Sequence, residues 1–263
     1  MRGSRLFPRQ RDSKAINSES SCPFVSSSVS QSSSLLISSA TPPSLFLMDI
    51  ITVLFHLVLL LSLPTVSIAL IKRSIQTDQS ALFALKSQLF DSSNLLRKNW
   101  TANVSVCHWI GVTCYSRHHR VVSLNLSYLG LQGSIPPEIG NLSFLNSIDL
   151  SGNNFQGKLP MLVHLRRLKY ISLANSNFGG EVPSGFGSLP NLQALDLSNN
   201  SFTGAIPTSL FNASKLESIS IMSNQLQGNI PQEIGNLGNL KVLRMANNQL
   251  TGLIPLTLFN ISS

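Results

Sequence analysis

Apolar and polar residues alternate in a short pattern that recurs along the second half of the chain. In each copy, two large apolar residues stand two positions apart. The six pairs are Leu124/Leu126, Ile148/Leu150, Ile171/Leu173, Leu195/Leu197, Ile219/Ile221 and Leu243/Met245. Successive pairs lie 24, 23, 24, 24 and 24 residues apart. A fixed period of this length predicts an array of stacked repeats.

The alternation predicts that each pair lies in a strand with one buried face. Stacked copies would place these strands side by side in a parallel sheet. The residue between the two apolar positions then faces the exposed, concave side. In chain order these residues are Asn125, Asp149, Ser172, Asp196, Ser220 and Arg244.

An asparagine follows the second apolar position by three residues in most copies. These asparagines are Asn153, Asn200, Asn224 and Asn248. A buried asparagine can pair with backbone groups where the chain leaves the strand. We therefore predict an asparagine ladder, interrupted where Leu129 and Ser176 occupy this position.

Each copy ends with a large apolar residue, a glycine and an apolar–proline pair, as in Phe202, Gly204 and Ile206-Pro207. We expect a backbone turn at the glycine that a Cβ would hinder, and then a return path along the outer side. Each copy supplies about six apolar side chains, each worth roughly 1.5–3 kcal/mol when buried. One copy cannot cover them alone, so the copies must stack.

The combined spacing, L-x-x-L-x-L-x-x-N-x-L-x-G-x-I-P, resembles the plant-specific class of leucine-rich repeat. Residues 77–86 look like the helix that opens such ectodomains, and Asn99-Trp100 with the segment 107–114 looks like their disulfide-bonded N-terminal cap. From about residue 76 to 263 the chain is similar to the ectodomain start of plant leucine-rich-repeat receptor-like Ser/Thr kinases. The immune-receptor-like subfamily, which senses microbial patterns, is the most similar.

This resemblance implies an α/β repeat fold. The fold is a leucine-rich-repeat solenoid, with a curved parallel sheet on the concave side and short helical or irregular convex segments. The expected parts are a disordered Ser-rich leader (1–47), a signal peptide (48–69), a helical N-terminal cap (70–117) and six repeats (118–263), the last incomplete. We expect Thr77 or Asp78 to N-cap the first helix.

The same resemblance implies a disulfide between Cys107 and Cys114. A zinc site that adds His118 and His119 is the alternative reading, but the Cys-x6-Cys spacing does not match usual zinc sites. A secreted chain also favours a disulfide. We therefore expect no metal and no cofactor.

An apolar run over 50–63, followed by Pro64 and the small residues Ser67 and Ala69, predicts a signal peptide cleaved after Ala69. An uncleaved membrane anchor is the alternative, because the apolar stretch 50–71 approaches spanning length. A start at Met48 would give an ordinary secretory protein, so we expect residues 1–47 to come from an over-extended gene model. An organelle-targeting leader is the alternative for these residues.

Charge and motifs exclude several function classes. The net charge is +8, yet only 11% of residues are charged. The basic residues are scattered apart from Arg166-Arg167-Lys169, which argues against nucleic-acid binding. A nucleophile elbow, a kinase glycine loop and the catalytic His-Arg-Asp-x-x-x-x-Asn motif of kinases are missing from the sequence, so we expect no catalysis from it.

Ligand binding remains, and the concave face supplies the candidates. An aromatic anchor with a few charges suits peptide recognition. The candidate contacts are Asp149, Tyr170, Asp196, Met222 and Arg244. We expect Ser172 and Ser220 merely to solvate the sheet.

Seven Asn-x-Ser/Thr sequons are present, and we expect glycans on six of them: Asn99, Asn103, Asn141, Asn199, Asn212 and Asn260. Three of these asparagines stand fifteen residues after the second apolar position of their repeat and therefore share one column on the outer side: Asn141, Asn212 and Asn260. Asn125 faces the concave side, and we expect it to stay unmodified.

The resemblance implies the extracellular ligand-binding region of a receptor-like kinase. It would recognise a peptide or microbial pattern, assemble with a co-receptor ectodomain and signal through a membrane span and kinase beyond Ser263. It would lie on the outer face of the plasma membrane, reached through the secretory pathway. The alternatives are a secreted repeat inhibitor of the apoplast and a truncated, non-signalling remnant, because the sixth repeat has an open apolar edge.

Overall fold

The computed structural model describes residues 52–54, 56 and 75–261. The predicted leader (1–47) lies outside these residues, as does most of the predicted signal peptide, of which residues 52–54 and 56 are helical. In the described segments, no helix combines the length and apolarity needed to cross a bilayer. The remaining description concerns residues 75–261.

A cap formed by residues 75–114 covers the first repeat. It comprises a helix over 75–87, β1 (Leu89–Phe90), α2 (Leu95–Asn99), the 3-10 helix η1 (Val106–His108) and β2 (Val112–Cys114). The indole rings of Trp100 and Trp109 stack with centroids 5.2 Å apart in its core. Cys107 and Cys114 form a disulfide, which confirms the predicted bond and engages both thiols that the zinc reading needed.

The predicted N-cap at Thr77 or Asp78 is wrong, because the helix already includes Ile75. Asp78 lies inside the helix and is only 1% exposed. Its carboxylate forms an ion pair with Arg120 (Nη2–Oδ1 2.7 Å) and accepts a hydrogen bond from the Val121 N–H (3.0 Å). This aspartate therefore joins the cap to the first repeat instead of starting the helix.

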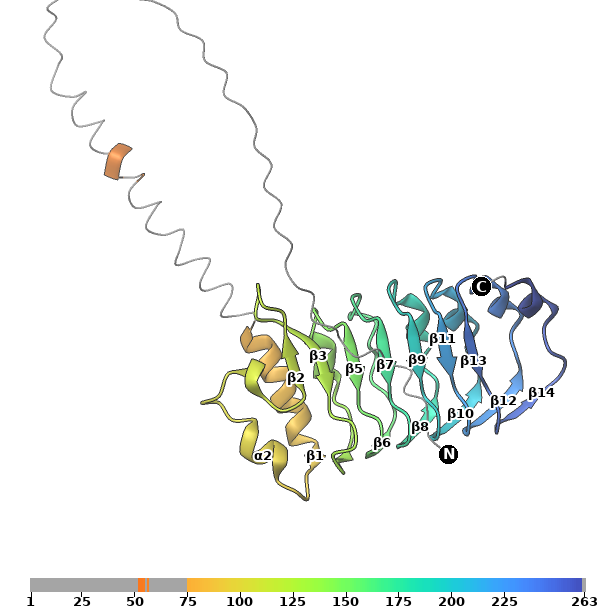
Figure 1. Ribbon diagram of the computed structural model, residues 1–263, viewed down its shortest axis with the longest axis horizontal. Helices are drawn as coiled ribbons and strands as arrows, with labels where there is room; N and C mark the ends of the chain where they lie inside the picture. The colour runs from red at the N-terminus through yellow and green to blue at the C-terminus, as the bar shows by residue number, and fades with distance from the viewer. Residues whose placement is uncertain (1–51, 55, 57–74, 262–263) are drawn as a thin grey trace, which may run out of the picture. The chain divides into compact units, whose positions relative to one another are not determined.

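The concave sheet contains one strand from each repeat and β2 at its cap end (Figure 1). Its order is β13-β11-β9-β7-β5-β3-β2, and only the β2–β3 pair is antiparallel. The repeat strands are β3 (Val121–Asn125), β5 (Ser147–Asp149), β7 (Tyr170–Ser172), β9 (Ala194–Asp196), β11 (Ser218–Ser220) and β13 (Val242–Arg244). Equivalent residues of neighbouring copies are paired throughout, as in Ile148 with Ile171.

A second sheet runs along the other end of each repeat, and the sequence pattern did not predict it. Its order is β1-β4-β6-β8-β10-β12-β14, with parallel pairs except at β1 (Figure 1). The strands after β1 are β4 (Gln132–Gly133), β6 (Asn154–Gly157), β8 (Asn177–Glu181), β10 (Ser201–Ala205), β12 (Gln225–Asn229) and β14 (Gln249–Thr251). Each strand of this sheet from β4 to β12 includes the repeat glycine, and Gly252 directly follows β14. These glycines have the expected positive φ, for example +76° at Gly204.

Short 3-10 helices form the convex side. They are η2 (Pro137–Asn141), η3 (Ser184–Ser188), η4 (Thr208–Asn212), η5 (Gln232–Asn236) and η6 (Leu256–Asn260). The 23-residue copy has no such helix between β6 and β7. A continuous apolar core fills the space between the two sheets and these helices, and the rings of Phe155 and Phe178 stack within it.

The asparagine column forms a hydrogen-bonded ladder. The Asn224 side-chain amide donates to the carbonyl oxygens of Leu197 and Ile221 and accepts from the Phe202 N–H. Asn153, Asn200 and Asn248 make equivalent bonds. At the interrupted position, the Ser176 hydroxyl is buried without a hydrogen-bond partner.

Candidate ligand-binding surface

The last residues of the six concave repeat strands form one row across the sheet. The pairing register joins Asn125 to Asp149, Asp149 to Ser172, Ser172 to Asp196, Asp196 to Ser220 and Ser220 to Arg244. We call these six residues the central row. Adjacent strands lie about 4.8 Å apart, so residues on every second strand are separated by about 10 Å.

Two carboxylates of the central row are held in the same way. Asp149 Oδ1 accepts hydrogen bonds from the Ser151 N–H (3.0 Å) and hydroxyl (2.6 Å). Asp196 Oδ1 accepts the same two bonds from Ser198 (3.0 and 2.5 Å). These Asp-Leu-Ser turns fix each side chain and use one oxygen. Among the hydrogen bonds of the described residues, none uses the second oxygen of either carboxylate.

The two serines of the central row are not solvated, contrary to our expectation. Ser172 and Ser220 are 3% and 5% exposed. Ser172 is paired in register with Asp149 and Asp196, whose larger side chains flank it. Along the central row, the larger charged side chains of Asp149, Asp196 and Arg244 therefore alternate with small, buried serines.

The other candidates extend the surface around this row. Arg244 is exposed at the end of β13, and its position places a positive charge two strands from Asp196. Tyr170 is half-buried and shares a face of β7 with Ser172. Met222 is half-buried and follows β11. The structure thus gathers Asp149, Tyr170, Asp196, Met222 and Arg244 on one sheet, with acids at β5 and β9 and a base at β13.

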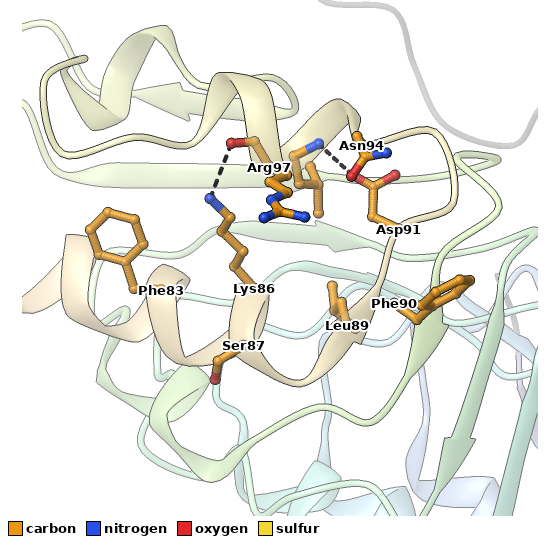
Figure 2. A pocket seen from close by; sticks show the side chains of 9 residues that line it. Phe83, Lys86, Ser87, Leu89, Phe90, Asp91, Asn94 and Arg97 are labelled. Atoms are coloured by element: carbon orange, nitrogen blue, oxygen red, sulfur yellow. Dashed lines mark hydrogen bonds between the residues drawn. The ribbon is translucent and has the colours of Figure 1, made fainter.

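A pocket of about 540 Å³ lies on the cap, away from the central row in sequence (Figure 2). Phe83 and Lys86 line it from the first helix, and Lys86 Nζ donates to the Trp100 carbonyl (2.7 Å). Burial opposes ionisation of Asp91, but hydrogen bonds from Ser93 and from backbone N–H groups outweigh it and hold the pKa of Asp91 below its ordinary value. Lys86 and Asp91 are thus engaged in hydrogen bonds within the cap (Figure 2).

A groove of about 780 Å³ lies beside the 23-residue copy. Lys158, Met161 and Glu181 line it together with convex apolar residues, and Met161 is 71% exposed. The segment between β6 and β7 that lines the groove lacks the 3-10 helix that the other repeats have after their strand of the second sheet. The groove belongs to the outer side and does not share residues with the central row.

The six predicted glycosylation sites differ in their surroundings. Asn141, Asn212 and Asn260 are exposed and each ends a 3-10 helix, so they occupy equivalent convex positions. Asn103 and Asn199 are also exposed. Asn99 is half-buried, and its side-chain oxygen accepts a hydrogen bond from the Ile110 N–H (2.5 Å).

Comparison with known families matches both parts of this architecture. The leucine rich repeat N-terminal domain model matches residues 75–115. Leucine rich repeat models match 120–142, 144–164, 166–226 and 239–261. The chain belongs to the leucine-rich-repeat family. Its curated relatives are plant receptor-like kinases, and the matched stretches span 8% to 12% of the length of the first four.

One such relative is the LRR receptor-like serine/threonine-protein kinase EFR of Arabidopsis thaliana. It is 43% identical over 89 residues, which are 34% of this leucine-rich-repeat chain and 9% of EFR. The family models place this chain in the leucine-rich-repeat part of such proteins and not in a kinase domain.

Two solved structures resemble the fold. The LRR ectodomain of the plant membrane receptor kinase GASSHO1/SCHENGEN3 from Arabidopsis thaliana, in complex with CASPARIAN STRIP INTEGRITY FACTOR 2, has a TM-score of 0.68 and 35% identity, covering 70% of this chain and 23% of that one. The Arabidopsis receptor kinase HAESA, in complex with the peptide hormone IDA and the co-receptor SERK1, has a TM-score of 0.56 and 29% identity, covering 70% and 36%.

Proposed function

We propose that residues 75–261 are the ligand-binding region of a plant receptor-like kinase and that the central row contacts an extracellular peptide. The proposal is supported by the charged residues of the central row, half-buried at Asp149 and Asp196 and exposed at Arg244. The fold is also that of receptor ectodomains solved in complex with their ligands. The protein would act at the outer face of the plasma membrane and would signal through a kinase, the activity named for its relatives.

The charge order of the central row gives the ligand a direction. A peptide lying across the strands would place cationic groups over Asp149 and Asp196, about 10 Å apart, and an anionic group over Arg244. The free carboxylate oxygens can accept hydrogen bonds from such groups, which are stronger than bonds between neutral partners. A ligand with the reverse charge order would meet like charges at each end.

We also propose a second protein partner, a co-receptor ectodomain. The HAESA complex contains both a peptide hormone and the co-receptor SERK1. A partner of this kind would contact the receptor beside the bound peptide.

The direct test is selection of peptides on the chain from a displayed random library, followed by affinity measurements with variants. We expect Asp149→Ala, Asp196→Ala and Arg244→Ala each to weaken the selected peptide by about tenfold, because each removes a charged contact. Alanine is preferred because asparagine at 149 or 196 would create an Asn-Leu-Ser sequon.

The matched control is Glu138→Ala, which removes an exposed acid from the convex helix η2. Its affinity for the selected peptides should stay within twofold of the unaltered chain. Peptides that bind equally well to all three central-row variants would contradict the proposed surface.

A further inference from the structure

Two arginines, from the first and third repeats, share one aromatic ring of the second repeat. The guanidinium carbons of Arg120 and Arg167 lie 4.6 and 4.0 Å from the ring centroid of Phe144. The three residues stand at equivalent positions of successive repeats, where the chain enters the concave strands. Stacking engages the face of a guanidinium and leaves its in-plane N–H donors available.

The N–H donors of the two guanidinium groups differ in their partners. Arg120 uses Nε (2.8 Å) and Nη2 (2.7 Å) to hold both carboxylate oxygens of Asp78. Arg167 is exposed, and within the described part of the chain no carboxylate lies within 4.0 Å of its guanidinium. Arg167 therefore repeats the stacked arrangement of Arg120 without the acid.

Further positive charge lies along the same edge. Arg166 and Lys215 are exposed. Lys215 Nζ donates to Asn191 Oδ1 (2.7 Å), and the Asn191 amide donates to the Arg166 carbonyl (2.9 Å), which links three repeats at this edge. Glu217, the acid two residues after Lys215, is paired with Lys241 (2.9 Å). We call Arg166, Arg167 and Lys215 the basic edge.

We propose that the basic edge binds an acidic segment of a partner protein, with Arg167 holding one carboxylate in the bidentate manner in which Arg120 holds Asp78. Planar carboxylates match the guanidinium fork, and such pairs are among the stronger hydrogen bonds in proteins. Because these residues lie outside the central row, this site is separate from the peptide-binding surface proposed above.

The spacing favours an extended protein segment as the occupant. Arg167 and Lys215 are two repeats apart, which corresponds to about 10 Å across parallel strands. In a polyproline II segment, acidic residues at every third position face the same side about 9 Å apart. One such segment can therefore reach both cations.

The test measures binding of the full chain to a fluorescent peptide of four Glu-Pro-Pro triplets, beside the same peptide with Gln for Glu. We expect the Glu peptide to bind at least tenfold more tightly than the Gln peptide. Arg167→Gln should weaken the Glu peptide about tenfold. Arg167→Lys should also weaken it, because lysine keeps the charge but lacks the fork.

The control is Lys98→Gln, which removes an exposed charge from α2 in the cap and should change affinity by less than twofold. Should Arg167→Gln disturb the thermal melt, the exposed pair Arg166→Gln and Lys215→Gln replaces it. Equal weakening by Lys98→Gln, equal binding of the Gln peptide, or tighter binding of a uronic-acid oligosaccharide of matched charge would overturn the proposal.

Discussion

At the scale of single residues, the asparagine ladder shows how a polar side chain can stabilise an apolar core. Asn224 is 9% exposed and satisfies backbone groups in two neighbouring repeats at once. A buried backbone group without a partner costs roughly 1–3 kcal/mol. In the four repeats that have it, this asparagine therefore removes a cost that stacking would otherwise impose.

Replacing this asparagine should reveal that contribution. We expect Asn224→Ala to lower the free energy of unfolding by about 2–4 kcal/mol, because it leaves several buried carbonyl and N–H groups unpaired. The converse change, Ser176→Asn, should raise the free energy of unfolding by about 1 kcal/mol by completing the ladder where the serine hydroxyl is unpaired. Urea titrations followed by circular dichroism measure both. Equal stability of the two variants would contradict this role.

The buried ion pair is a second residue-scale feature, and local sequence could not reveal it. Asp78 fits the pattern of a helix N-cap, which is how we interpreted it. Its actual partner, Arg120, stands 42 residues further on. Likewise, the cluster of two arginines around one ring is visible only when successive repeats are compared, because Arg120, Phe144 and Arg167 occupy equivalent positions. An alignment of the repeats that included the residues before each strand would have revealed this column.

At the scale of elements, neighbouring 3-10 helices interlock at glycine. A Cβ on Gly187, in η3, would lie 1.7 Å from the carbonyl oxygen of Ser209, in η4. Gly238, between two repeats, has nothing within 4 Å of the equivalent point. Gly187 is therefore required by close packing between helices, whereas the space around Gly238 would admit a Cβ.

Alanine substitution should distinguish them. We expect Gly187→Ala to lower the free energy of unfolding by about 3 kcal/mol, because the helices must move apart. Gly238→Ala should change it by less than about 1 kcal/mol. Thermal melts of both variants check this. A Gly187→Ala chain as stable as the unaltered one would show that η3 and η4 can adjust freely.

Elements differ in how well the sequence predicted them. The concave strands followed from alternation because each has one apolar and one polar face. The second sheet did not, since its strands contain a glycine at positive φ, which reads as a turn. The central row was assembled correctly because its members lie at one repeat position, whereas burial of Ser172 depends on the size of its neighbours in register.

At the scale of the whole molecule, the proposed glycosylation sites and the proposed ligand-binding surface lie on different sides. Asn141, Asn212 and Asn260 end convex helices, and the central row lies on the opposite, concave sheet. Glycans at these three positions would leave the ligand surface open.

We expect chains expressed in plant cells to carry glycans at these three positions. Asn141→Gln, Asn212→Gln and Asn260→Gln should each remove one glycan, seen as a mobility shift that glycosidase treatment abolishes. Asn125→Gln should cause no shift, because the Asn125 oxygen is bonded to Ser127 within the concave turn. Loss of a glycan on Asn125→Gln would show that the concave face is modified as well.

The 23-residue copy carries a consequence for engineering. Its missing residue is absorbed between β6 and β7, while Ser147 and Tyr170 remain paired in the concave sheet. Chain length on one side can thus change without shifting the register on the other. A small tag or fluorophore inserted near Met161 would report on the protein while leaving every concave side chain in place.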